Sequence, residues 1–180
     1  EHENLAKVTK ALCKDELLRI SKNIATAISK GSTLFFCGNG GSAADSQHLA
    51  AEFVGRFKND RKPLRSIALT TDSSILTCIS NDYSFDKIFS RQLNALANKG
   101  DQLITFSTSG KSKNILEALH TGNKLKMGTI AFLGKDGGLA KSLAQDVILI
   151  PSNTTARIQE MHILLGHILC EIVEKELKIN

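Results

Sequence analysis

The chain has 180 residues, of which 42% are hydrophobic, 23% charged and 5% aromatic, and its formal net charge is +5. The proportions are ordinary for a soluble globular protein, and the length suits a single core, so we expect residues 1–180 to form one domain. The scattered basic residues and few aromatic residues exclude a base-stacking surface and argue against a nucleic-acid partner. A mildly basic chain is compatible with an anionic small molecule.

The apolar runs and the cysteines bear on membrane association and compartment. No apolar run approaches the length that spans a membrane, and no signal peptide is visible, so we expect no membrane partner. The four cysteines form no C-x-x-C pair, and three of them lie in apolar contexts. This pattern indicates free thiols in a reducing compartment and predicts a cytoplasmic protein.

The first predicted element is a long amphipathic helix over residues 4–30. Its apolar residues recur near helical spacing with lysines between them, and Gly31 suits the position that ends a helix. The segment carries no catalytic side chain. We therefore expect it to pack on the rest of the subunit or on another subunit.

Five short apolar runs then alternate with helix-like segments. The runs cover residues 33–37, 65–69, 102–106, 128–133 and 147–150. The segments between them cover residues 43–58, 73–80, 85–97, 113–124 and 138–144. This alternation predicts an α/β fold, a three-layer αβα sandwich with a five-stranded parallel sheet and a long helix at each end of the chain.

The loops that follow the strands are expected to form the ligand site. Right-handed crossovers place the carboxyl ends of all the parallel strands at one edge of the sheet, where ligands bind. Residues 38–42, 70–72, 107–112 and 134–138 should therefore line one crevice.

The first of these loops has the composition of an anion site. Three glycines within residues 38–41 let the backbone turn sharply, and Ser42 stands where a helix N-cap is expected. A strand, a glycine turn and a helix N-terminus together form the usual geometry for holding an anion. His48 and Glu52 follow four residues apart, so both project from one helix face and could supply a metal site or an acid–base pair.

Both features of this motif also have an ordinary structural explanation. A glycine turn after a strand is often only a connection to a helix. A histidine and a glutamate four residues apart are more often a surface pair than a site. The motif alone is therefore suggestive, and the segments that follow strengthen the functional interpretation.

The second glycine-serine loop is Ser107-Thr108-Ser109-Gly110-Lys111-Ser112. Its four hydroxyls, the amides at the start of the next helix and the helix dipole all favour a phosphate, although a capped helix with a polar loop has the same composition. A P-loop is excluded because Thr105 stands where that motif requires its first glycine. The dinucleotide fingerprint fits poorly because the third glycine is missing and Asp72 lies too far along the chain.

The last predicted element is a helix over residues 154–177 that is apolar around most of its circumference. Such a helix is buried, and in a chain of this size it indicates a subunit interface. Gln159, His162 and His167 lie within this apolar context, and Gln159 and His167 share one stripe with Ile163. A buried histidine is usually a core residue, but two polar residues two turns apart on a buried helix suggest a site.

In this order and spacing the motifs resemble a known family. They are Cys37-Gly-Asn-Gly-Gly-Ser, Gln47-His48 through Glu52, Ser80-Asn81-Asp82, Ser107-Thr-Ser-Gly-Lys-Ser, and Arg157-Ile-Gln-Glu-Met-His162 with His167. The chain resembles sugar isomerase (SIS) domains and, among them, the phosphoheptose isomerases. The resemblance covers almost the whole chain.

The resemblance implies a fold, an assembly and an activity. The implied fold is a five-stranded parallel sheet between helices, and the implied assembly is a homotetramer with active sites at subunit interfaces. The implied substrate is a phosphorylated seven-carbon sugar, sedoheptulose 7-phosphate, and the product is D-glycero-D-manno-heptose 7-phosphate. This reaction is the first step towards the heptose of lipopolysaccharide or related glycans.

The resemblance also implies a role for individual residues. It makes Glu52 the base and His167 the acid. The implied zinc ligands are His48, Glu52, Gln159 and His167. The implied substrate contacts are Asn39, Gly40, Gly41, Ser42, Glu52, Asn81, Asp82, Ser107, Thr108, Ser109, Ser112 and Gln159. Some members are acidic where this chain has Ala156, a departure that touches no acid, base or metal position.

The implied chemistry suits these side chains. Ketose–aldose interconversion moves a proton between C1 and C2 through an enediol, and it needs a base at carbon, an acid/base at oxygen and a held phosphate. A carboxylate and an imidazole suit the two proton transfers, and a divalent metal could polarise the carbonyl. A carboxylate bound tightly to metal is a weaker base, so Glu52 is not expected to fill both roles in the same state.

A non-catalytic binding module is the main alternative. SIS relatives include proteins that sense sugar phosphates and a group that binds a bacterial replication initiator. These relatives keep the glycine and serine loops but need not keep the acid and the base. The presence of both Glu52 and His167 therefore favours an enzyme, while isomerisation of another phosphosugar stays open.

Overall fold

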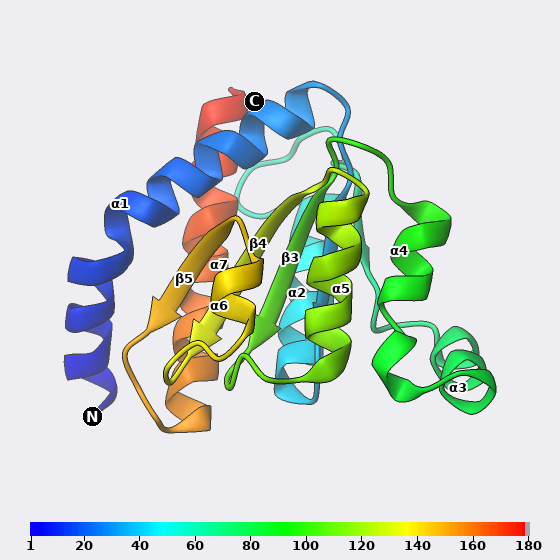
Figure 1. The fold of residues 1–180 in the computed structure, drawn as a ribbon. Coiled ribbons are helices and arrows are strands. Elements are labelled where there is room, and N and C mark those ends of the chain that lie inside the picture. Colours follow the sequence, from blue (N-terminus) through cyan, green and yellow to red (C-terminus); the bar gives the residue numbers. More distant parts are fainter. Residues whose placement is uncertain (179–180) are drawn as a thin grey trace.

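The five apolar runs form one parallel sheet, which confirms the expected fold class. A computed structural model describes residues 1–178 (Figure 1). The strands lie in the order β2-β1-β3-β4-β5. Their bounds are Leu34–Gly38 (β1), Ser66–Ala68 (β2), Gln102–Ser107 (β3), Gly128–Gly134 (β4) and Asp146–Ile150 (β5).

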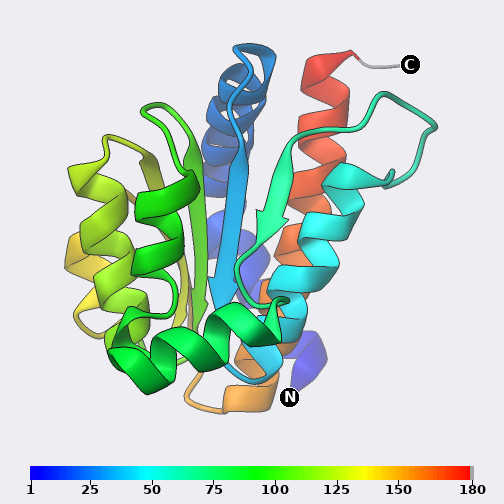
Figure 2. The same cartoon turned by 90° about the vertical axis from the view of Figure 1, so that its right-hand side faces the viewer.

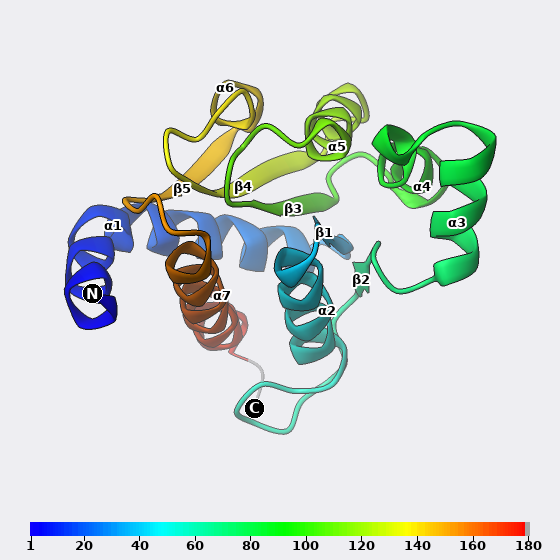
Figure 3. The same ribbon diagram turned by 90° about the horizontal axis from the view of Figure 1, so that it is seen from below.

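Helices cover both faces of the sheet (Figures 1 and 3). One face carries α1 (His2–Ser29), α2 (Gly41–Val54) and α7 (Thr155–Leu177). The other carries α3 (Ser73–Asp82), the 3-10 turn η1 (Phe85–Lys87), α4 (Ser90–Leu96), α5 (Lys113–Lys124) and α6 (Ala140–Leu143). Among the described residues, none of these helices is both long and apolar enough to cross a membrane.

The alternation of side chains along each strand divides the core into two layers. On β1, Phe36 enters the cluster beneath α1, α2 and α7, whereas Phe35 and Cys37 enter the cluster beneath α3 to α6. All five residues of β1 are buried. A strand buried on both faces reads as a continuous apolar run, which is why the sequence pattern predicted it.

The order of the strands fixes where a ligand can enter. β1 pairs with β2 on one side and with β3 on the other, so the chain reverses its direction of winding between β1 and β3. In parallel sheets the crevice opens beyond the carboxyl ends of the strands at this switch point. The loops after β1 and β3, which hold the two glycine-serine motifs, therefore lie at this crevice.

The helices α2 and α7 pack directly against each other (Figure 3). Gly166 of α7 permits a close approach, because a Cβ atom there would lie 2.6 Å from Cδ1 of Leu49 on α2. Every fourth residue of a helix returns to nearly the same face. The contact therefore brings the face of α2 that carries His48 and Glu52 towards the face of α7 that carries His167.

The structure corrects two of the predicted helices. The helix expected over residues 43–58 ends at Val54, because the backbone turns at Gly55 and the Arg61 side chain donates to the carbonyl oxygens of Glu52 and Phe53. The helix expected over residues 85–97 is divided into η1 and α4.

Candidate active site

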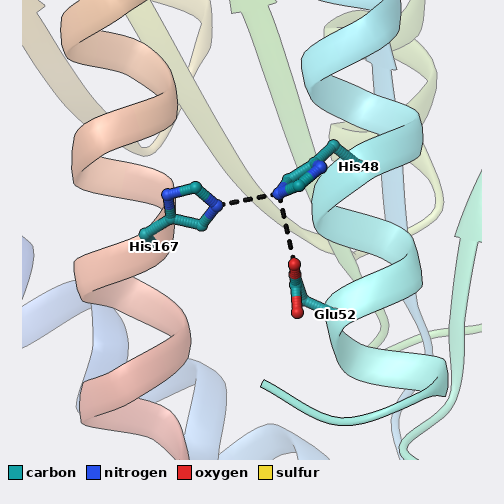
Figure 4. Close-up of side chains that lie close together, drawn as sticks. All are labelled: His48, Glu52 and His167. Carbon is teal, nitrogen blue, oxygen red and sulfur yellow. Dashed lines mark hydrogen bonds and ion pairs between the residues drawn. The ribbon is translucent and has the colours of Figure 1, made fainter. Parts of the chain in front are cut away.

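Three polar side chains meet between α2 and α7 (Figure 4). The Nε2 atom of His48 lies 2.8 Å from the Nε2 atom of His167 and 3.2 Å from the Oε1 atom of Glu52. His48 and His167 are 119 residues apart in the sequence. The structure therefore brings together the two predicted acid–base residues and a predicted metal ligand.

The donor set of this cluster fits a divalent metal. One ligand atom from each of His48, Glu52 and His167 lies within 4.8 Å of the others. Two imidazole nitrogens and a carboxylate oxygen are ligands that zinc accepts, and a catalytic zinc site commonly has three protein ligands and one open position. Two facing imidazole nitrogens can also share a proton, so the same cluster suits acid–base chemistry.

His167 lies in surroundings that favour its neutral form. Burial lowers its pKa, a charge on His48 lowers it further, and only Glu52 acts in the opposite direction. The Phe57 ring stacks on the imidazole with 5.6 Å between the ring centroids and an angle of 20° between the planes. A neutral imidazole has a lone pair with which to accept a proton or bind a metal.

Asp45 is a neighbouring acidic group that the sequence reasoning did not single out. It precedes His48 by three residues on α2, and burial raises its pKa to about 6, although His48 opposes the shift. Its Oδ2 atom is buried and has no hydrogen-bond partner among the described residues. The spacing to His48 was the signal in the sequence that could have identified it.

A second part of the candidate site is a small cavity of about 60 Å³ beside the loop after β3. It is lined by Asn39, Ser42, Phe106, Ser107, Thr108, Ser109, Ser112 and Gln159. No carboxylate lines it, so nothing there repels an anion. Seven of these eight residues were predicted to contact substrate.

The hydroxyls in this cavity keep their protons available. Ser107 Oγ accepts a hydrogen bond from the Gly110 amide, and Ser109 Oγ accepts one from the Lys111 amide. Ser112 is the N-cap residue of α5, yet its side chain makes no capping bond. Each of these serines can therefore donate its O–H to a phosphate, next to the positive end of the helix dipole.

A reciprocal amide pair joins the loop after β1 to the first turn of α5, the helix that follows the loop after β3. Asn39 Nδ2 donates to Asn114 Oδ1 at 2.9 Å, and Asn114 Nδ2 donates to Asn39 Oδ1 at 2.8 Å. Asn114 is buried, and the sequence reasoning missed it because its partner is 75 residues away. The two side-chain amides satisfy each other's hydrogen-bonding groups and hold the loop after β1 against the start of α5.

The loop after β4 also joins this region, as predicted. Gly110 has a φ of +62°, and a Cβ atom there would overlap the backbone of Gly137. The amide of Ala140 donates to the carbonyl oxygen of Gly110 at 3.0 Å. The loop after β2 instead contacts α2, where Gln47 donates to the carbonyl oxygen of Thr70.

Gln159 lies towards the cavity from α7. A Cβ atom at Gly41, the first residue of α2, would come within 2.6 Å of Nε2 of Gln159. Only glycine at this position therefore leaves room for the side-chain amide of Gln159. Gly40, with a φ of +57°, makes the preceding turn. Gln159 thus borders the hydroxyl-lined cavity and lies two turns before His167 on the same helix.

Asn81 and Asp82 lie apart from both groups. They are exposed in the last turn of α3, where Asn81 Nδ2 donates to Asp82 Oδ1 at 2.8 Å. Within residues 1–178, neither lines the cavity nor joins the histidine–glutamate cluster. Their predicted contact with substrate is therefore not formed by this subunit's cavity alone.

His162 is a core residue rather than a member of the site. It is fully buried against Phe106 and Phe132, and its Nε2 atom lies 3.2 Å from the carbonyl oxygen of Leu133. Burial lowers its pKa to about 4, while the bond to Leu133 opposes the shift. His162 is therefore an example of the usual case, in which a buried histidine is part of the core.

Comparisons with known proteins give the family. The SIS domain family model matches residues 2–134. A phosphoheptose isomerase from Campylobacter jejuni is 47% identical over 175 residues, which covers 97% of this chain and 94% of the relative. The structure of phosphoheptose isomerase GmhA from Neisseria gonorrhoeae is 38% identical and matches with a TM-score of 0.92, covering 97% of this chain and 94% of that one.

A second solved structure agrees with the first. A phosphoheptose isomerase from Francisella tularensis is 33% identical and matches with a TM-score of 0.93, covering 96% of this chain and 92% of that one. The fold and the paired glycine-serine loops thus define a SIS domain. The chain belongs to the phosphoheptose isomerase family of SIS-domain proteins.

The buried His162 predicts an acid-dependent loss of stability. Its pKa falls from an ordinary 6.5 to about 4 in the folded state, so between these values the unfolded chain binds a proton that the folded chain does not. Stability is therefore intact above pH 6.5 and declines as the pH falls towards 4. Relative to His162→Gln, the wild-type protein should lose about 2 kcal/mol of unfolding free energy between pH 6.5 and 4.5.

Urea unfolding of both proteins at the two pH values measures this difference. His120→Gln serves as the control because His120 is an exposed residue of α5, and its curve should follow that of the wild type. Parallel losses in the wild type and His162→Gln would contradict the assignment of a neutral, buried His162.

Proposed function

We propose that this protein converts sedoheptulose 7-phosphate to D-glycero-D-manno-heptose 7-phosphate, with Glu52 as the base and His167 as the acid. The observation that carries the proposal is the meeting of a carboxylate and two imidazoles between α2 and α7, the two helices whose N-terminal parts contribute Ser42 and Gln159 to the hydroxyl-lined cavity. Membership of the phosphoheptose isomerase family supports the choice of substrate. The product would supply heptose for lipopolysaccharide or related glycans.

The phosphate would bind at the cavity after β3. Ser107, Thr108, Ser109 and Ser112 offer hydroxyl donors, and the first amides of α5 add partial positive charge. Asn39 and Ser42 complete the other wall from the loop after β1. Holding the phosphate far from the reacting carbons supplies binding energy that positions C1 and C2.

Two proton transfers then complete the isomerisation. The Glu52 carboxylate removes a proton from C1 while His167 gives a proton to the C2 carbonyl oxygen, which yields an enediol. Glu52 returns its proton to C2, and His167 recovers a proton from the oxygen on C1, which leaves an aldehyde at C1. Each transfer by a positioned group is typically worth about 10²- to 10⁴-fold in rate.

Zinc is the proposed cofactor, held by His48, Glu52, Gln159 and His167. The cluster of two histidines and one glutamate fits a divalent ion, and Gln159 lies on the same helix as His167. When bound, zinc would polarise the carbonyl oxygen and steady the negative charge that develops on it. Gln159 also faces the first glycine loop, so it would link the two halves of the site.

A homotetramer with active sites at subunit interfaces is the proposed assembly. An apolar groove runs between α1 and α7, lined by residues that include Leu17, Leu18, Leu165 and Ile172. Two of its other lining residues are exposed apolar side chains, Leu164 at 40% and Ile168 at 37% exposure. Apolar surface of this kind marks an interface in a soluble protein. A partner subunit there would lie next to the helix that carries His167.

The proposed compartment is the cytoplasm. Cys13, Cys37 and Cys170 are buried free thiols, and Cys78 is an exposed one. Burial raises the pKa of Cys13, so that thiol stays protonated and unreactive. Free thiols in this number suit a reducing compartment.

Replacing the proposed base gives the most direct test of the mechanism. Glu52→Gln keeps the size of the side chain and removes the proton acceptor, so kcat should fall by about 10²- to 10⁴-fold, while the fold is retained. Glu117→Gln is the control, since Glu117 forms a surface ion pair with Lys87 on the other side of the molecule. Turnover by Glu52→Gln within twofold of the wild type would remove Glu52 as the base.

The phosphate assignment predicts a change in KM rather than in kcat. Ser109→Ala and Ser112→Ala each remove one hydrogen bond to a charged group, so each should raise KM for the sugar phosphate by roughly tenfold. Ser142→Ala, at an exposed serine of α6, should change nothing. An unchanged KM in both loop variants would place the phosphate elsewhere.

The apolar groove predicts an assembly larger than a dimer. Sedimentation equilibrium should give about four times the 19.5 kDa chain mass. Ile168→Asp should shift the protein to smaller species, because assembly would then bury the unpaired charge of the new aspartate in the interface. Leu139→Asp is the control, since Leu139 is 64% exposed and lies at the start of α6. A wild-type monomer would contradict the assembly.

A further inference from the structure

A buried ion pair joins the loop after α2 to α7, two turns beyond His167 on that helix. Nε of Arg61 lies 2.6 Å from Oε1 of Glu174, and the two side chains are only 1% and 6% exposed. Arg61 belongs to the loop after α2, and Glu174 belongs to α7. Neither residue faces the substrate cavity, and the proposed mechanism gives neither a role.

Arg61 determines where α2 ends. Its Nη2 atom donates to the Glu52 carbonyl oxygen at 2.7 Å, and its Nη1 atom donates to the Phe53 carbonyl oxygen at 2.9 Å. In a continuing helix these two oxygens would accept from the amides four residues later. The guanidinium takes the place of those amides and fixes the backbone of the residue that carries the proposed base.

Glu174 holds in place the loop residue that stacks on His167. Its carboxylate accepts from the amide of Phe57 at 3.2 Å and from the amide of Lys58 at 3.3 Å. These bonds hold the loop after α2 against α7 (Figure 2), with the Phe57 ring stacked on His167. Glu174 also lies seven residues after His167, which places both on one face of α7.

The charge of Glu174 is matched by its partners. Burial would raise its pKa, but the hydrogen bonds from Arg61 and from the Phe57 and Lys58 amides outweigh that effect and hold the pKa below its ordinary value. A charged carboxylate and a guanidinium thus share a dry site with five backbone groups. Such an arrangement is geometrically strict, because one guanidinium and one carboxylate must satisfy several fixed backbone groups at the same time.

We propose that Arg61 and Glu174 are positioning residues that set the separation of the Glu52 carboxylate from the His167 imidazole. They act through the last turn of α2 on one side and through the Phe57 ring on the other. Proton transfer is sensitive to displacements of about 1 Å, so loosening this pair lowers kcat without weakening the hold on the phosphate. The proposal rests on the proposed function of Glu52 and His167.

A purely stabilising role is the competing explanation, and two variants separate it from positioning. Arg61→Lys keeps the charge beside Glu174 but cannot reach the carboxylate and both α2 carbonyls with one ammonium. The double variant Arg61→Met/Glu174→Leu removes both charges, so no unpaired buried charge remains to unfold the protein. If the pair positions the catalytic groups, both variants should fold and both should have a lowered kcat.

The chain offers a matched control. Nζ of Lys58 lies 2.8 Å from Oε2 of Glu171, so this pair also links the loop after α2 to α7. It is solvent-exposed and touches neither carbonyl at the end of α2. Lys58→Met/Glu171→Gln should therefore leave kcat and KM within twofold of the wild type.

The experiment combines steady-state kinetics with NMR of labelled histidines. For Arg61→Lys and for Arg61→Met/Glu174→Leu we expect kcat to fall at least tenfold with KM within twofold. The chain has five histidines, so the ring signals can be assigned, and the His167 signals should move as the stacking with Phe57 is lost. Phe57→Leu should reproduce that movement.

The outcomes are distinct. A folded double variant with wild-type kcat would overturn the proposal and leave the pair a stabilising role alone. Unmoved His167 signals in Arg61→Lys would also overturn it. If the wild-type protein fails to turn over sedoheptulose 7-phosphate, the proposed function fails, while the NMR comparison still tests whether the pair positions His167.

Discussion

The contact between α2 and α7 is the constraint on which the site depends. The residues that would do the chemistry are divided between these helices, and they meet only because the helices approach closely at Leu49 and Gly166. The contact is held at both ends as well. At one end Gln159 lies against Gly41, and at the other the buried Arg61–Glu174 pair joins the loop after α2 to α7. These three contacts between α2 and α7 suit a site that must hold a carboxylate and an imidazole in fixed geometry.

The sheet supplies the second half of the site from its switch point. The loops after β1 and β3 lead to helices on opposite faces of the sheet, and the paired amides of Asn39 and Asn114 hold the first loop to the start of α5. The hydroxyl-lined cavity that results lies next to the start of α2, and the same helix carries the histidine–glutamate motif about two to three turns later. One helix thus connects the proposed phosphate position with the proposed proton transfers, and this distinguishes the site from a loop that only binds a sugar phosphate.

Local patterns in the sequence predicted most of the fold. Buried parallel strands are continuous apolar runs, and glycine and serine clusters mark the loops that follow them, so all five strands and the crevice loops could be located. The sequence did not reveal interactions that act over long distances. Asn114, Arg61 and Glu174 are ordinary polar residues in sequence, and their partners lie up to 117 residues away. The early end of α2 was missed for the same reason, since a side chain nine residues later replaces the helix amides.

The most direct measurement of the central claim is proton NMR of the purified protein with sedoheptulose 7-phosphate in D₂O. We expect an anomeric aldose signal with deuterium at C2, because the proton that the proposed base Glu52 would return to carbon should exchange with solvent in the enediol state. A chelator should abolish the signal, and added zinc should restore it. A zinc-supplied, well-folded tetramer that produces no aldose would contradict the account and favour a non-catalytic sugar-phosphate-binding module.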